Sequence, residues 1–189
     1  MEIPNKLIQL SKDFAASQAE EFGVPSVFHL DLSYRKGQWL AEKLNANREI
    51  VAIGTYLMDC MLGVAFKEGR AAEHVKMSKI KAEELIDGFS ITKDYKDNIL
   101  ACVSEHHGKE KFYSLESEIC CNADCYRFAS VEGFVGGIHH GREMDITDLL
   151  NLYRDKANEK WKALSLDICK ADLKNDYQAI KQLINQFLP

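Results

Sequence analysis

An isolated carboxylate in an apolar segment is the first feature of this chain that points to chemistry. Asp59 is the only residue with a formal charge in the seventeen-residue run Ile50–Phe66. Burying a carboxylate is costly unless it meets a cation, a hydrogen-bond donor or a metal ion. The chain offers five further side chains that could converge on it: His29, His74, His106, His107 and Asp124. Imidazole and carboxylate ligands together favour Mn, Fe, Ni, Co or Zn.

These side chains are expected on different helices, or at helix ends, that pack around one interior. Apolar residues repeat at helical spacing nearly throughout, and no proline lies between Pro25 and Pro189. The predicted helices span residues 3–21, 26–44, 48–67, 71–87, 95–106, 115–128, 150–168 and 175–188. The glycine-rich stretch 131–143 is expected to be flexible. The predicted fold class is all-α, a single helical-bundle domain.

Length and composition support one domain over residues 1–189. The chain has 46% hydrophobic residues, a net charge of −5 and a pI near 5.7. This balance argues against a broad surface for nucleic acid or anionic membrane, although it leaves room for a local basic pocket that binds phosphate.

The apolar run Ile50–Phe66 is better explained as a buried helix than as a membrane span. It falls short of the roughly 20 residues that a span needs, and a carboxylate would lie near its middle. The N-terminal residues do not have the pattern of a signal peptide. We therefore expect a cytoplasmic protein that binds neither membrane nor nucleic acid, and the oligomeric state stays open.

The six cysteines do not form a recognisable disulfide or zinc pattern. Cys121 and Cys125 lie four residues apart, a spacing that would suit a metal on one face of a helix. Because no second pair accompanies them, we interpret the cysteines as small buried apolar residues.

The histidines and aspartates occur in an order that can be compared with known motifs. The segments are His29, then Leu57-Met58-Asp59-Cys60-Met61-Leu62-Gly63, then Glu73-His74 with Ser78 and Ala82, then Ser104-Glu105-His106-His107, and finally Ser114-Leu115-Glu116 followed by Asn122-Ala123-Asp124. This order resembles the HD-domain metal-dependent phosphohydrolase superfamily, in particular its small stand-alone members. The resemblance covers roughly residues 25 to 140, which implies an HD-like core over these residues and C-terminal packing helices at about 146–188.

The chain departs from the family pattern at the residue that gives the family its name. Met58 stands where the family has the histidine of its His-Asp pair, and Asn122 stands where relatives often have a second acid. A thioether is a poor substitute for imidazole on Mn or Mg. The resemblance implies His29, Asp59 and Asp124 as the remaining metal ligands, with His107 or Cys60 available to fill the gap.

The resemblance also implies a reaction. A divalent ion (Mn, Fe, Ni, Co, Zn or Mg) would polarise a phosphate oxygen and activate a water for attack on phosphorus. Asp59, His74 and His106 are the implied catalytic residues, because the two histidines would stabilise the developing charge. Lys76, Lys79, Arg127 and His107 are further candidates for binding the substrate, a small phosphorylated molecule or nucleotide.

Three functional hypotheses follow. The first is a metal-dependent phosphohydrolase. The second is a catalytically inactive relative that binds a nucleotide or another ligand as a regulator, which the loss of histidine at Met58 favours. The third is a different chemistry on the same scaffold, such as oxygen-dependent cleavage at a di-iron centre, or an unrelated helical protein. Asp59 and Asp124 could also form buried ion pairs or caps without a metal.

Overall fold

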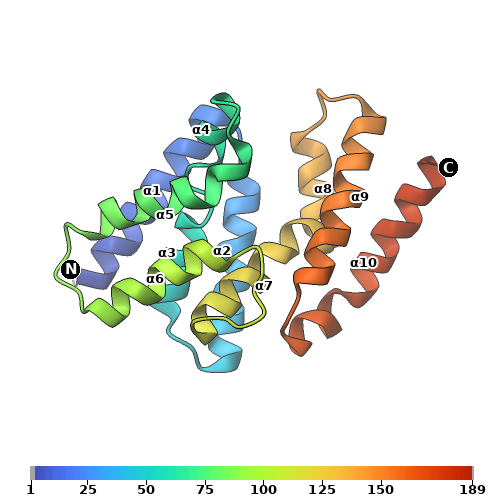
Figure 1. The fold of residues 1–189 in the computed structure, drawn as a ribbon. Helices are drawn as coiled ribbons and strands as arrows, with labels where there is room; N and C mark the ends of the chain where they lie inside the picture. Colours follow the sequence, from blue (N-terminus) through green and yellow to red (C-terminus); the bar gives the residue numbers. More distant parts are fainter. Residues whose placement is uncertain (1–2, 189) are drawn as a thin grey trace.

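The computed structural model describes residues 3–188, so residues 1–2 and 189 of the predicted domain lie outside the described part. Within it the chain forms helices and no strands, which confirms the all-α fold class (Figure 1). The helices are α1 (Ile3–Phe22), α2 (Val27–Leu44), α3 (Arg48–Leu57), α4 (Leu62–Lys67), α5 (His74–Ile86), α6 (Lys93–Glu105), α7 (Leu115–Ala129), α8 (Val131–His140), α9 (Ile146–Ala163) and α10 (Asp167–Phe187). A short 3₁₀ turn, η1 (Ala71–Glu73), precedes α5.

Helix α7 is the central element of the molecule. It packs against α2, α3 and α6 on one side and against α8, α9 and α10 on the other. In Figure 1 it crosses between the blue and green helices and the orange and red ones. Every residue from Ile119 to Arg127 on this helix is buried. A helix buried around its whole circumference is a core helix, so any polar side chain on it needs an internal partner.

Two hydrophobic clusters flank α7. The larger one joins α1, α2, α3, α5, α6 and α7 and includes Leu32, Ile53, Leu57, Ile99 and Ile119. The smaller one joins α8, α9 and α10, which lie side by side in Figure 1, and includes Phe134, Leu150, Tyr153, Ile180 and Ile184. The candidate site lies where these two parts meet at α7.

The predicted continuous helix over residues 48–67 is wrong at its centre. Helix α3 ends at Leu57, a turn follows at residues 58–61, and α4 begins at Leu62. The hydroxyl of Ser78, on α5, accepts a hydrogen bond from the Met61 amide at 3.1 Å. A partner distant in sequence thus satisfies a backbone group that a continuous helix would have paired internally.

The segment Arg48–Lys67 is the one stretch of described residues that is long and apolar enough to cross a membrane. Its most apolar window is 72% buried inside the protein. The core helix of a folded domain has the same composition, and the turn at residues 58–61 divides this segment into two shorter helices. The burial agrees with the prediction of an internal element.

The glycine-rich stretch 131–143 is not the flexible segment that we predicted, because most of it forms helix α8. Its glycines allow close packing. A Cβ on Gly133 would lie 2.4 Å from the Tyr126 carbonyl oxygen, and one on Gly137 would overlap the Tyr153 hydroxyl. The serine Ser130 begins the helix as its N-cap and accepts from the Gly133 amide. Here glycine permits contact between helices.

The predicted helix over residues 150–168 also contains a break. Helix α9 ends at Ala163, Leu164 is extended, and α10 begins at Asp167, earlier than the predicted residue 175. The side chain of Asn122, on α7, accepts hydrogen bonds from the Ser165 and Leu166 amides at 3.2 and 3.1 Å. This asparagine thus holds the connection between α9 and α10 in place.

Candidate functional site

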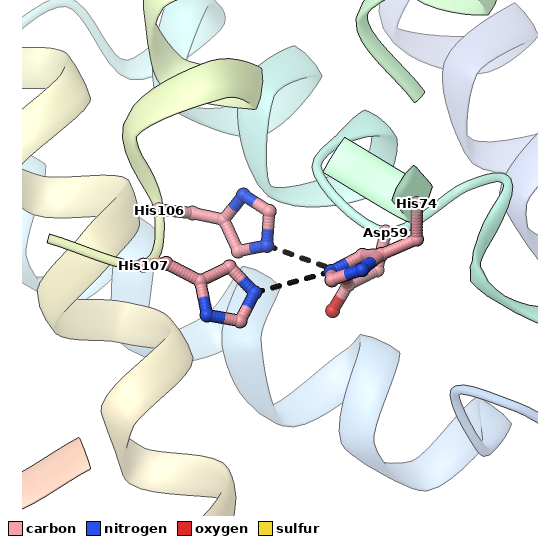
Figure 2. Close-up of side chains that lie close together, drawn as sticks. All are labelled: Asp59, His74, His106 and His107. Carbon is pink, nitrogen blue, oxygen red and sulfur yellow. Dashed lines mark hydrogen bonds and ion pairs between the residues drawn. The ribbon is translucent and has the colours of Figure 1, made fainter. Parts of the chain in front are cut away.

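Four side chains from three segments meet around one carboxylate oxygen. Asp59, His74, His106 and His107 each place one potential ligand atom within 4.8 Å of the others. Figure 2 shows the consecutive His106 and His107 directed toward Asp59 and His74. The Nε2 atoms of His106 and His74 lie 3.2 and 3.4 Å from Asp59 Oδ1. These four residues are called the histidine cluster below.

Each member of the histidine cluster comes from a helix end. Asp59 lies in the turn between α3 and α4, where the backbone leaves its helical course. His74 is the first residue of α5, and His106 is the C-cap of α6. Residues at helix ends can present a side chain inward while the helices themselves pack through their apolar faces.

The backbone fixes which ring nitrogen carries the proton in two of the histidines. His74 Nδ1 lies 2.7 Å from the Ala71 carbonyl oxygen, and His106 Nδ1 lies 2.8 Å from that of Val103. A carbonyl oxygen only accepts, so both Nδ1 atoms donate. In the neutral rings both Nε2 atoms then direct a lone pair toward Asp59.

Nitrogen lone pairs and a carboxylate oxygen at these distances repel one another unless a proton or a metal ion lies between them. Among the described residues, Asp59 Oδ1 and His106 Nε2 are fully buried and have no hydrogen-bond partner. Either a proton on an imidazole or a bound metal ion would resolve the repulsion. A histidine whose other nitrogen donates to a carbonyl is the usual arrangement of a metal ligand. The histidine cluster therefore fits a divalent ion with nitrogen and oxygen ligands.

The second oxygen of Asp59 belongs to a different set of contacts. Arg127, one turn after Asp124 on α7, places Nη1 2.5 Å from Asp59 Oδ2 and 2.8 Å from Asp124 Oδ1. Lys160, on α9, lies with Nζ 2.6 Å from Asp124 Oδ2. The four side chains Asp59, Asp124, Arg127 and Lys160 are all buried and carry two negative and two positive charges. They are called the ion-pair network below.

The ion-pair network keeps its carboxylates ionised. Burial by itself would raise the pKa of Asp124, but Lys160 and then Arg127 outweigh burial and hold this pKa at about 2. Burial opposes ionisation of Asp59 too, and Arg127 followed by His106 brings its pKa well below the usual range. Lys160 in turn has a raised pKa, because Asp124 more than offsets the cost of its burial.

His29 lies beside this centre, but its ring is held elsewhere. Its Nε2 donates a hydrogen bond to the Gly133 carbonyl oxygen at 2.9 Å, and its ring is tilted against Phe128. Burial and the nearby Arg127 lower the pKa of His29 to about 4, so the ring is neutral at pH 7. Of the three metal ligands implied by the resemblance, only Asp59 is in the histidine cluster. His29 and Asp124 have other partners.

A cavity of about 450 Å³ opens onto both groups of side chains. Its polar wall is formed by His29, Asp59, His74, His107, Asp124, Arg127, His140, Lys156 and Lys160. Its apolar wall is formed mainly by Leu62, Phe66, Phe128, Met144, Leu149, Leu152 and Tyr153. A volume of this size suits a small organic ligand, and the walls suit one with an anionic end and an apolar end.

The four predicted substrate-binding residues do not all lie at the cavity. Arg127 and His107 line the cavity, whereas Lys76 and Lys79 lie on the exposed face of α5 and do not. Lys160 lines the cavity but was not predicted from the sequence. Its spacing from Ala157 and Leu164 places this lysine on the inward face of its helix, and that was a usable signal.

The low pKa of Asp124 predicts an acid-dependent contribution to stability. A carboxyl group whose pKa is lower in the folded protein than in the unfolded chain stabilises the fold above the unfolded pKa and ceases to do so as the pH falls toward 2. In metal-free buffer, the difference in unfolding free energy between the wild type and Asp124→Asn should narrow by about 2 kcal/mol from pH 6 to pH 2. Urea titrations at both pH values measure the unfolding free energies of the two proteins. A difference between them that stays the same at pH 6 and pH 2 would contradict the assigned ion pairs.

No family model and no curated protein matches this chain by sequence. Solved structures do match it over nearly the whole length. A protein from Lactobacillus plantarum superposes on this chain with a TM-score of 0.72 at 15% sequence identity. The match covers 98% of this chain and 97% of the Lactobacillus chain. YpgQ from Bacillus subtilis, in complex with ADP, gives a TM-score of 0.66 at 14% identity, with coverages of 98% and 95%.

A third similar structure is an HD-superfamily hydrolase from Bacillus thuringiensis. It has a TM-score of 0.64 at 18% identity and covers 98% of this chain and 96% of its own. Identities this low establish architecture only. The arrangement of helices and the resemblance in the order of the motifs lead to the same result: this chain has the fold of the HD-superfamily hydrolases.

Proposed function

We propose that this protein is a metal-dependent phosphohydrolase that acts on a small phosphomonoester or nucleotide. The observation that carries the proposal is the histidine cluster. Within the described residues, buried His106 Nε2 and Asp59 Oδ1 face each other without a hydrogen-bond partner, and His74 Nε2 lies 3.4 Å from the same oxygen. The ligands that we propose for the ion are Asp59, His74 and His106, with His107 as the fourth. His107 Nε2 lies 3.1 Å from His74 Nε2.

The walls of the cavity support a phosphorylated ligand. Arg127, Lys160 and Lys156 supply positive charge on the polar wall, and guanidinium and ammonium groups are the usual partners of phosphate. The apolar wall, with Phe66 and Phe128, offers a surface on which a base or another flat group can pack. The ADP complex of YpgQ supports the nucleotide alternative.

Different residues of this chain would have different roles in the proposed reaction. When bound, a divalent ion supplies Lewis-acid chemistry, polarising a phosphoryl oxygen and acidifying a water. His74 and His106 are oriented by the Ala71 and Val103 carbonyls and so present their Nε2 atoms without reorganisation. Lys160 and Arg127 would bring positive charge to the wall that faces the phosphoryl group.

A second function is favoured by a specific observation. Arg127 and Lys160 already neutralise both buried carboxylates, so the site does not depend on an ion to balance its charge. A protein with this arrangement could bind a nucleotide in the cavity as a regulatory ligand and carry out no hydrolysis.

The decisive experiment compares phosphate release by the wild type, His106→Ala and His139→Ala. Metal-stripped protein is supplied in turn with Mn, Co, Ni, Zn and Mg and with a panel of nucleotides and sugar phosphates. We expect ion-dependent turnover in the wild type and a loss of about 100-fold or more in His106→Ala. The control His139→Ala, an exposed histidine of α8 outside the cavity, should stay within about twofold of the wild type.

The two functions predict different outcomes of this experiment. Equal turnover in wild type and His106→Ala would contradict a catalytic histidine cluster. If no ion binds and no compound is hydrolysed, yet ADP raises the melting temperature, the regulatory function is the correct one.

A further inference from the structure

The space between the Asp59 and Asp124 carboxylates is filled by a single guanidinium. Arg127 Nη1 lies 2.5 Å from Asp59 Oδ2 and 2.8 Å from Asp124 Oδ1, so one nitrogen contacts both acids. The side chains of Asp59, Asp124 and Arg127 are 7%, 2% and 6% exposed. An ion that used these same two oxygens as ligands would have to displace the guanidinium first.

The surrounding contacts leave Asp124 without a free oxygen. Its Oδ2 pairs with Lys160 Nζ at 2.6 Å, and Lys160 is itself only 2% exposed. His29, the third side chain near this position, donates its Nε2 proton to the Gly133 carbonyl. Two negative and two positive charges therefore balance within the ion-pair network, and this balance needs no bound metal.

We infer that Arg127 is a built-in cation that takes the place of a metal ion between Asp59 and Asp124. Asp124 is therefore not a metal ligand in this protein, and the centre accepts one ion, on the histidine side of Asp59. The statement about that one ion rests on the proposed function, whereas the replacement of a metal by Arg127 stands independently of it.

Arg127 is therefore expected to be essential for the stability of the metal-free protein. If its charge is removed, Asp59 and Asp124 become neighbouring buried carboxylates with only Lys160 and the imidazoles of the histidine cluster nearby. Breaking a buried ion pair at one partner is strongly destabilising, because the other partner keeps its charge and loses its compensation. A divalent ion should then bind between the two acids and restore what the guanidinium supplied.

The test uses full-length metal-stripped protein and the variant Arg127→Met, with Arg35→Met as the matched control. Arg35 also bridges two carboxylates, Asp31 and Glu132, each at 2.7 Å, but on the surface. We expect the melting temperature of Arg127→Met to fall by about 10 °C without metal, and that of Arg35→Met by less than about 3 °C.

The same variants are then titrated with Mn²⁺ and Zn²⁺. Arg127→Met should bind one more ion per chain than the wild type and recover at least about half of its lost melting temperature. An unchanged melting temperature, or an unchanged number of bound ions, would overturn the inference. If the wild type binds no ion but Arg127→Met binds one, the inference holds and the proposed metal-dependent hydrolysis fails.

Asp124→Asn covers the case in which Arg127→Met does not fold. Because we infer that Asp124 is not a ligand, the affinity of this variant for Mn²⁺ should stay within about threefold of the wild type by calorimetric titration. A loss of ion binding in Asp124→Asn, or two ions bound per wild-type chain, would show that Asp124 is a ligand and that Arg127 does not replace a metal.

Discussion

Replacing Asp59 by asparagine is expected to abolish binding of the proposed ion and to lower the proposed phosphate release about 1,000-fold. Asp59 is the only anion among the four members of the histidine cluster, so its loss leaves three neutral imidazoles to hold a divalent charge. The side chain keeps its size, and Arg127 keeps its contact with Asp124. Metal content by elemental analysis and turnover under saturating ion and substrate measure the two effects separately.

The matched control is Asp31→Asn. Asp31 also pairs with an arginine, Arg35, at 2.7 Å, but its side chain is 59% exposed and lies outside the cavity. Its replacement should leave metal content and turnover unchanged. If Asp59→Asn retains more than about a tenth of the wild-type turnover, the histidine cluster is not the catalytic centre.

Gly133→Ala is expected to destabilise the protein by about 3 kcal/mol. The added Cβ would lie 2.4 and 2.5 Å from the carbonyl oxygens of Tyr126 and Arg127. Both are backbone atoms of α7, so the strain cannot be relieved by a side-chain rotation. Helix α8 would have to move away from α7, and His29 would then lose its hydrogen bond to the Gly133 carbonyl.

Gly88→Ala serves as the control for this substitution. A Cβ on Gly88 meets nothing within 4 Å, and its backbone is not in the left-handed region. Alanine there should leave stability unchanged or raise it by up to about 1 kcal/mol. Urea unfolding of the two variants measures the difference, and equal midpoints would contradict the close packing of α8 on α7.

The regular parts of the fold could be predicted because their determinants are local. Helix α2 was predicted over residues 26–44 and spans Val27–Leu44, since Ser26 is a good N-cap and Leu44 ends the apolar pattern. Asp124 was expected to point into the same interior as the histidines, and it is buried on α7. The order of the motifs along the chain predicted that His74, His106 and Asp59 lie at one site.

The two breaks in the predicted helices could not be found in the same way. Neither contains proline or glycine at the break, and both are held by a side chain from another helix: Ser78 at residues 58–61 and Asn122 at residues 164–166. A polar contact between residues 17 or 43 positions apart leaves no trace in a local periodicity. The packing role of Gly133 and Gly137 is hidden for the same reason.

Only one of the two cations that pair with the buried carboxylates was predicted from the sequence. Arg127 was predicted only as one of several cations that could bind phosphate, and its contact with Asp59 depends on how α7 packs against the turn after α3. Lys160 lies 36 residues after Asp124, so its spacing from Ala157 and Leu164 could indicate an inward-facing lysine but not the carboxylate with which it pairs. Long-range pairing of charges is decided by the tertiary structure.

The turn that carries Asp59 also has a consequence for the chain before it folds. Asp59 is the only formal charge between Ile50 and Phe66, a stretch rich in β-branched and aromatic residues that contains no proline. Uncharged stretches of this kind self-associate as β-structure when they are exposed in newly made or unfolded chains. The carboxylate that contacts the histidines in the folded protein therefore acts, in the unfolded chain, as a gatekeeper against aggregation.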